Sequence, residues 1–66
     1  MKIIFNRQEK EVAEGISINE LVQQLDFNPV TVAVELNGQL LLHEEYSRKL
    51  QPGDKVELVL NMGGGA

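Results

Sequence analysis

The sequence predicts an α+β domain in which a mixed sheet of about five strands carries one helix across one face. Three observations support this prediction. The chain has 66 residues, enough for one small domain with a single core. A capping-box motif, Ser17 to Glu20, opens the only segment with clear helical periodicity. Segments of strand character precede and follow it, so the single apolar stripe of the helix must cover one sheet face.

The first residues are typical of a hairpin, in which one strand is followed by a turn and a second strand. Residues 2–6 are β-branched and aromatic, and Ile4 faces the side opposite to its two neighbours. Residues 6–8 can turn the chain, and residues 9–14 then form a weak, mostly polar second strand. That strand depends on Val12 and on the preceding turn, because intrinsic propensity alone also allows a helix there.

The helix has the strongest local signal in the chain. Ser17 is the expected N-cap and Glu20 lies at N3, so each side chain can bond the backbone N–H of the other residue. The helix is expected to cover about residues 18–26, because the segment from Asp26 to Pro29 stops it and the residue before a proline resists α geometry. Its apolar stripe follows the i, i+3, i+4, i+7 pattern and consists of Ile18, Leu21, Val22 and Leu25.

A second hairpin follows the helix. Residues 31–36 alternate between apolar and other side chains, which predicts a half-buried strand. Asn37 and Gly38 form a strong short hairpin turn, because both residues tolerate positive φ. Residues 39–42 are then its short partner strand.

The rest of the chain predicts a connection, a turn and a last strand. Residues 43–46 are a polar connection in which Tyr46 is the expected anchor, and residues 52–54 form a tight turn. Residues 55–60 alternate again as a strand. We expect the first and last strands to be central and parallel, and we expect residues 61–66 to hold no regular structure.

The composition excludes several classes of function. Ten acidic residues against six basic ones give a net charge of −4. The sequence has no cluster of basic residues, so nucleic acid is not expected as a main partner. The absence of cysteine excludes disulfides, thiol catalysis and thiolate metal sites. No apolar run is long enough to span a membrane, and the first residues do not form a signal peptide. We therefore expect a cytoplasmic protein with no bound metal or cofactor.

The polar side chains of the sequence give little indication of chemistry inside the domain. The single histidine, His43, has no evident orienting partner or cleft, so a solvated loop position is the favoured interpretation. The acidic residues Glu9, Glu11 and Glu14 can serve either as a solvated strand edge or as a surface that complements a basic partner. A domain of this size leaves no room for an enclosed substrate pocket. We therefore expect the chemistry to be done on this chain, or by a partner, rather than inside the domain.

The glycines at the C-terminus are the feature that suggests a function. Gly63, Gly64 and Gly65 have no side chain to pack, and a chain without side chains can enter a narrow channel in another protein. The terminal carboxylate could then lie beside a nucleotide bound by that protein. A frayed terminus or an expression remnant is an equally weighted alternative.

The chain resembles the ThiS family of sulfur carriers over its whole length. The resemblance rests on the opening Lys-Ile-Ile-Phe-Asn, the helix start at residues 17–21, and Val-Ala-Val-Glu-Leu-Asn-Gly at 32–38. It also rests on Leu-Gln-Pro-Gly-Asp-Lys-Val-Glu at 50–57 and on the terminal glycines. The resemblance implies a ubiquitin-like β-grasp fold, with a domain over residues 1–61 and a glycine-rich tail over residues 62–66.

The resemblance also implies a carrier rather than an enzyme. An activating enzyme would use ATP to adenylate the terminal glycine, and a persulfide would convert it to a thiocarboxylate for thiazole synthase. Gly64 and Gly65 correspond to the reactive end and Gly63 to the flexible part of the tail. This chain departs from the family by ending in Ala66. Three explanations remain open: a peptidase removes Ala66, the activating enzyme tolerates it, or it is a peculiarity of the sequence.

Partner docking is expected on the surface beside the tail. Ile4, Val59 and Met62 are the predicted docking residues, since the first two point away from the helix in the expected register. Two other functions remain open at this point. The chain could carry sulfur for another pathway, of the molybdopterin or cysteine type, or it could be a β-grasp interaction module with an inert tail.

Overall fold

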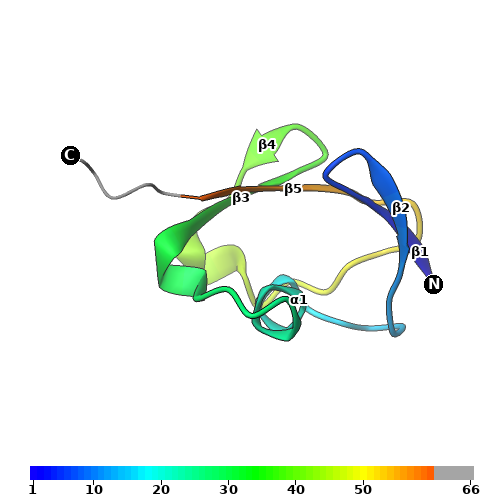
Figure 1. Cartoon of the computed structure of the whole chain (residues 1–66), viewed down its shortest axis with the longest axis horizontal. Helices are drawn as coiled ribbons and strands as arrows, with labels where there is room; N and C mark the ends of the chain where they lie inside the picture. Colours follow the sequence, from blue (N-terminus) through cyan, green and yellow to red (C-terminus); the bar gives the residue numbers. More distant parts are fainter. Residues whose placement is uncertain (61–66) are drawn as a thin grey trace.

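The computed structural model describes residues 1–60 of the chain, and these form a five-stranded mixed sheet with one helix on one face (Figure 1). The sheet order is β2-β1-β5-β3-β4, which confirms the predicted α+β class. The strands are β1 (Lys2–Phe5), β2 (Gln8–Glu11), β3 (Val32–Leu36), β4 (Gln39–Leu40) and β5 (Lys55–Leu60). The helical elements are α1 (Ile18–Gln24) and the 3-10 turns η1 (Pro29–Thr31) and η2 (His43–Glu45).

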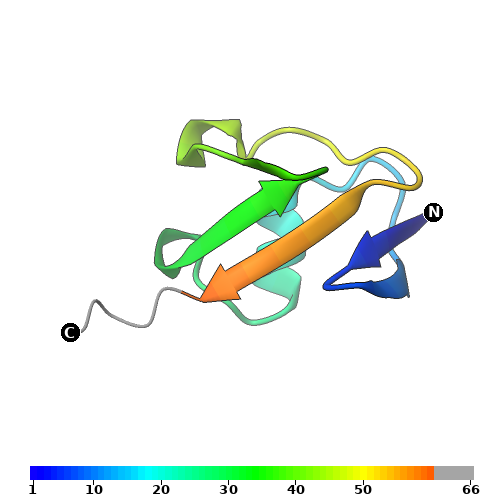
Figure 2. The same ribbon diagram turned by 90° about the horizontal axis from the view of Figure 1, so that it is seen from above.

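Strand β5 lies in the middle of the sheet (Figure 2). It pairs parallel with β1, through Ile4 opposite Lys55, and antiparallel with β3 over its full length. The prediction that the first and last strands are central and parallel is therefore confirmed, since both are internal to the sheet and pair parallel with each other. The outer strands β2 and β4 each pair antiparallel with a single neighbour.

The first hairpin is tighter than the sequence suggested. Asn6 and Arg7 both adopt positive φ, 48° and 71°, the conformation that a two-residue type I′ turn requires. The Asn6 carboxamide oxygen also accepts a 2.9 Å hydrogen bond from the Leu58 backbone N–H, which ties this turn to β5. The second strand is a strand and not a helix. Its predicted range of 9–14 was wrong at both ends, because the short turn starts pairing at Gln8 and the ladder ends at Glu11.

The helix begins where the sequence predicts and ends earlier. The Ser17 hydroxyl accepts from the Glu20 backbone N–H at 3.0 Å, and the Glu20 carboxylate accepts from the Ser17 N–H at 2.9 Å. Asp26 takes a left-handed φ of 64°, and Phe27 N–H bonds the Val22 carbonyl at 3.1 Å. These are features of a Schellman ending. The predicted end at residue 26 was wrong for this reason.

The second hairpin agrees with the sequence at its turn and differs at its ends. Asn37 and Gly38 both have positive φ, as predicted for the turn. The partner strand is only Gln39–Leu40 rather than 39–42, because the chain leaves the ladder after one further bond from Leu41 N–H to the Val34 carbonyl. The predicted strand start at residue 31 also belongs to η1.

Tyr46 is the buried anchor that the sequence predicted. Its side chain is almost fully buried, and its hydroxyl donates to the Val32 carbonyl at 3.3 Å. The core lies between α1 and the inner face of the sheet (Figure 1). It consists of Ile3, Ile16, Ile18, Leu21, Val22, Val32, Val34, Leu36, Leu41, Tyr46, Leu50 and Val56.

We expect Ser17→Ala to lower the free energy of unfolding by about 1 kcal/mol, the usual value of an N-cap side chain. In a domain of this size that corresponds to a Tm lower by about 4–8 °C. Thermal unfolding followed by circular dichroism measures the shift. Ser47→Ala is the matched control, because Ser47 is exposed and caps no helix. Equal Tm values for the two variants would contradict this account of the helix start.

The capping box also sets the charge state of Glu20. Hydrogen bonds from the Ser17 backbone N–H and then its side chain hold the pKa of Glu20 below its usual 4.5. A carboxyl with a lowered folded-state pKa stabilises the fold above its unfolded pKa, and that contribution is lost as pH falls through the folded pKa. Ser17→Ala removes the side-chain hydrogen bond and keeps the backbone N–H, so it is expected to raise the pKa of Glu20 only part of the way to its usual value, which an NMR titration measures.

Candidate functional site

The face of the sheet opposite α1 is the candidate functional surface. Side chains alternate along each strand, so those between the buried core positions point away from the helix. Within residues 1–60 no helix covers this outer face (Figures 1 and 2). We define the outer face by Lys2, Ile4, Ala33, Glu35, Leu40, Lys55, Glu57 and Val59.

The structure places two of the predicted docking residues on this outer face but does not bring them together. Ile4 is half-buried opposite Lys55 at the start of β5. Val59 lies four residues further along the same strand, about 13 Å away at ~3.3 Å per residue. Met62 lies outside the described residues, as do Gly63, Gly64, Gly65 and Ala66. The docking role of all these residues stays a prediction.

The neighbours of Val59 form an apolar groove at the end of β5. Its lining residues come from η1, β3, β4, η2 and β5. Several are large side chains that are well exposed: Val30 at 75%, Leu40 at 66%, Val59 at 51% and Leu60 at 48%. Single exposed apolar residues are ordinary, but a contiguous group of this kind marks an interaction surface. We call this surface the apolar groove; it is lined by Val30, Val32, Ala33, Leu40, Leu41, His43, Tyr46, Val59 and Leu60.

The sequence reasoning missed the contribution of Val30 and Leu40. Val30 belongs to η1, which the sequence did not predict, and its backbone N–H bonds the Asn28 side chain at 2.9 Å. Leu40 is opposite Glu35 in the register of the second hairpin and is therefore on the outer face. The Asn37-Gly38 turn fixes that register. Counting residues outwards from the turn along both strands pairs Leu40 with Glu35, and this count is the signal that could have found Leu40.

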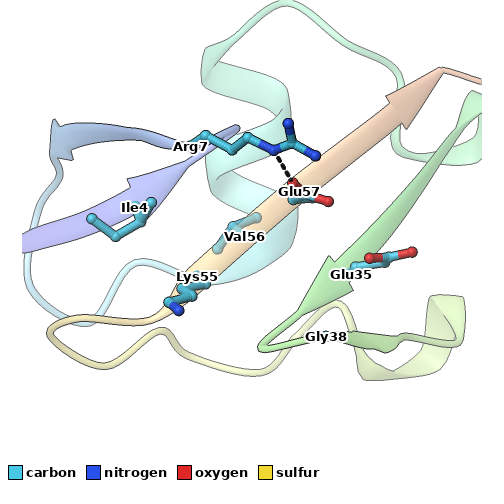
Figure 3. A pocket seen from close by; sticks show the side chains of 7 residues that line it. All are labelled: Ile4, Arg7, Glu35, Gly38, Lys55, Val56 and Glu57. Carbon is cyan, nitrogen blue, oxygen red and sulfur yellow. Dashed lines mark hydrogen bonds and ion pairs between the residues drawn. The ribbon is translucent and has the colours of Figure 1, made fainter.

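A charged depression occupies the other half of the outer face (Figure 3). The Arg7 Nε atom donates to the Glu57 carboxylate at 3.4 Å. Glu35 lies directly opposite Glu57 on the neighbouring strand, and in Figure 3 it turns away from both of these side chains. The depression is lined by Ile4, Arg7, Glu35, Gly38, Lys55, Val56 and Glu57. The outer face is therefore apolar towards the end of β5 and charged towards its start.

His43 has a structural environment rather than a catalytic one. Its Nε2 atom lies 3.0 Å from the Pro29 carbonyl oxygen, and its ring packs on Tyr46 with 4.8 Å between centroids. These contacts join η1 to η2 at the wall of the apolar groove. Among the described residues, no group of acidic and histidine side chains is arranged to hold a metal ion. In that part of the chain no helix is long and apolar enough to cross a membrane.

The fold and this surface together define the class of protein. A mixed sheet of order β2-β1-β5-β3-β4 with one helix across one face is the ubiquitin-like β-grasp fold. Its last described residue, Leu60, lines an exposed apolar groove. The class is therefore a small β-grasp domain with a surface suited to a protein partner beside the point from which its C-terminal residues continue.

Comparison with known proteins identifies the family. The ThiS family model matches residues 3–65. The sulfur carrier protein ThiS of Escherichia coli strain K12 is 33% identical over 66 residues, which cover 98% of this chain and 100% of that protein. The crystal structure of a thiamine biosynthesis protein (ThiS) from Geobacter metallireducens matches with a TM-score of 0.83 at 35% identity, covering 98% of this chain and 100% of that one. The chain belongs to the ThiS family.

One further relative is a much larger protein. A thiazole synthase from Paramagnetospirillum magneticum is 30% identical over 67 residues. The match covers 100% of this chain but only 21% of that protein. A segment similar to the whole of this chain is therefore one part of a polypeptide named for the synthase.

Proposed function

We propose that this chain is a sulfur carrier for thiamin biosynthesis that bears the sulfur as a C-terminal thiocarboxylate. The observation that carries the proposal is the end-to-end match to the Escherichia coli sulfur carrier, in which both chains are covered almost completely. Membership of the same family supports the expectation that the chain is a carrier and not an enzyme. Its glycine-rich end, Gly63 to Gly65, provides the chemical group.

The proposed chemistry takes place on the terminal carboxylate. A carboxylate is a poor electrophile, so an activating enzyme first joins it to AMP from ATP and releases pyrophosphate. A persulfide sulfur then attacks the carbonyl carbon and displaces AMP, and a thiol cleaves the resulting disulfide to leave the thiocarboxylate. This route needs no cysteine in the carrier, and the chain has none. The chain itself binds no cofactor in this proposal, because ATP belongs to the activating enzyme. Loading is proposed to take place in the cytoplasm.

The identity of the reacting residue depends on Ala66. We propose that a peptidase removes Ala66, so that Gly65 bears the reacting carboxylate and Gly64 precedes it. A methyl group on the last residue adds bulk at the point where the tail would enter the active site of the activating enzyme. Tolerance of alanine by that enzyme is the alternative, and mass spectrometry of the loaded chain distinguishes the two.

The proposed acceptor of the sulfur is thiazole synthase. The Paramagnetospirillum magneticum protein supports this partner, because one polypeptide of that name includes a segment similar to this whole chain. The test is reconstitution of thiazole formation with the activating enzyme and thiazole synthase of the same organism. Thiazole product that requires this chain supports the proposal. Loading with sulfur but no thiazole product would instead favour a carrier for another pathway, of the molybdopterin or cysteine type.

We expect Val59→Asp to weaken binding to the activating enzyme at least tenfold without unfolding the domain. Val59 is half-exposed within the apolar groove, so a carboxylate there would be desolvated on docking while the free chain could keep it in water. Isothermal titration calorimetry measures the affinity, and circular dichroism checks the fold.

The control is Leu42→Asp, because Leu42 is 62% exposed but does not line the apolar groove. It introduces the same charge and should leave the affinity within about twofold. A folded Val59→Asp variant that binds like the original chain would exclude the apolar groove as the docking site. Ile4 and Met62 are the other proposed docking residues.

A further inference from the structure

The outer face has an unfavourable pair of like charges at its centre. Glu35 on β3 and Glu57 on β5 are direct cross-strand partners, and like charges in such positions destabilise a sheet. Glu57 is partly neutralised by Arg7, whose Nε atom lies 3.4 Å from its carboxylate. Within residues 1–60 the half-buried Glu35 side chain forms no ion pair and no hydrogen bond. The described contacts of the Glu35 carboxylate therefore do not stabilise the sheet.

The position of Glu35 suggests a different reason. It lies opposite Leu40 on one side and Glu57 on the other, so it stands at the boundary between the charged depression and the apolar groove. Figure 3 shows its carboxylate turned away from Arg7 and Glu57. An incompletely paired carboxylate beside a large exposed leucine can accept a cationic side chain from a partner that also fills the groove.

We propose that Glu35 receives an arginine side chain of thiazole synthase when the synthase docks on the outer face. This inference rests on the proposed function and adds the chemistry of the contact. The arginine would pair with Glu35, and an apolar side chain next to it would enter the apolar groove beside Leu40. Arginine is preferred to lysine because its planar guanidinium can bond a carboxylate through two N–H groups.

One observation favours the synthase as the occupant. In the Paramagnetospirillum magneticum protein the segment similar to this chain shares a polypeptide with the rest of the synthase. A tether of that kind raises the effective concentration of the two parts, so little intrinsic affinity is needed. A separate chain must instead supply its affinity from its own surface. The net charge of −4 favours a positively charged face in any partner, so it supports a cationic contact rather than the synthase in particular.

The test measures binding of this chain to purified thiazole synthase of the same organism by biolayer interferometry. Glu35→Arg should weaken binding at least tenfold, and Glu35→Gln by about three- to tenfold. Gln23→Arg is the matched control for Glu35→Gln, because it raises the net charge by the same one unit at an exposed position of α1, on the opposite side of the sheet from the outer face. It should change the affinity less than threefold.

Thermal unfolding adds a readout that a structural role of Glu35 would not produce. Glu35→Gln removes the repulsion from Glu57, so its Tm should rise by about 1–5 °C while its affinity for the synthase falls. A residue that only supports the fold would lower both quantities.

Three results would overturn the inference. The first is wild-type affinity in a folded Glu35→Arg variant, and the second is an equal loss of affinity in Glu35→Gln and in the Gln23→Arg control. The third is the absence of measurable binding between the synthase and the unaltered chain. The proposed function is judged separately, because reconstituted thiazole formation with the unaltered chain can succeed even if Glu35 has no part in docking.

Discussion

Removing Gly64, Gly65 and Ala66 together should abolish sulfur loading while leaving the domain folded. The truncated chain still ends in a glycine carboxylate, on Gly63, but this group lies two residues, or about 7 Å of extended chain, short of the proposed reacting position at Gly65. All the described core residues, which lie within residues 1–60, are kept. The measurement is intact mass after incubation with ATP, the activating enzyme and a persulfide donor. The truncated chain should show no replacement of oxygen by sulfur, and its Tm should stay within a few degrees of the original.

Removing Ala66 alone is the informative comparison. The chain then ends in Gly65, which the proposal assigns as the reacting residue, so loading should be at least as fast as in the full chain. Loss of loading in this shorter truncation would refute the assignment to Gly65. Loading of the full chain with Ala66 retained would show that the activating enzyme accepts alanine.

Leu21→Ala should lower the free energy of unfolding by about 2–5 kcal/mol, the usual range for a buried leucine. Leu21 is fully buried on the face of α1 that packs against the sheet. A domain of this size has a total stability of only about 3–10 kcal/mol. The variant should therefore lose a large share of its stability, and urea unfolding measures the loss.

The control for Leu21→Ala is Gln23→Ala, at an exposed position of the same helix. That substitution should change the stability by no more than about 0.5 kcal/mol. If Leu21→Ala also cost less than about 1 kcal/mol, the helix could not be packed on the sheet as described, because no large apolar contact would have been lost.

The elements that were predictable from the sequence have local signals. Ser17 and Glu20 bond each other's backbone across one turn, so the start of α1 is encoded within four residues. The Asn37-Gly38 turn likewise needs only its own two residues to favour positive φ. The order and direction of the strands then follow from placing one apolar helix stripe on one sheet face.

The features that were not predictable depend on contacts between distant segments or on unusual backbone states. The helix ends early because Asp26, a residue other than glycine, adopts a left-handed conformation. Strand β4 is short because Leu41 turns into the core, where it is buried. The apolar groove combines η1 and β4 with the end of β5, so no single stretch of sequence contains its pattern. Alternation along the strands predicted the direction of Val59 but not its neighbours.

The central claim, that the chain carries sulfur on its C-terminus, is tested most directly by the intact mass of the protein isolated from its own host. The account predicts a species that ends at Gly65 and has one oxygen replaced by sulfur. The contradicting result is a species that retains Ala66 and gains no sulfur even after ATP and the activating enzyme are added. That result would leave a β-grasp interaction module with an inert tail.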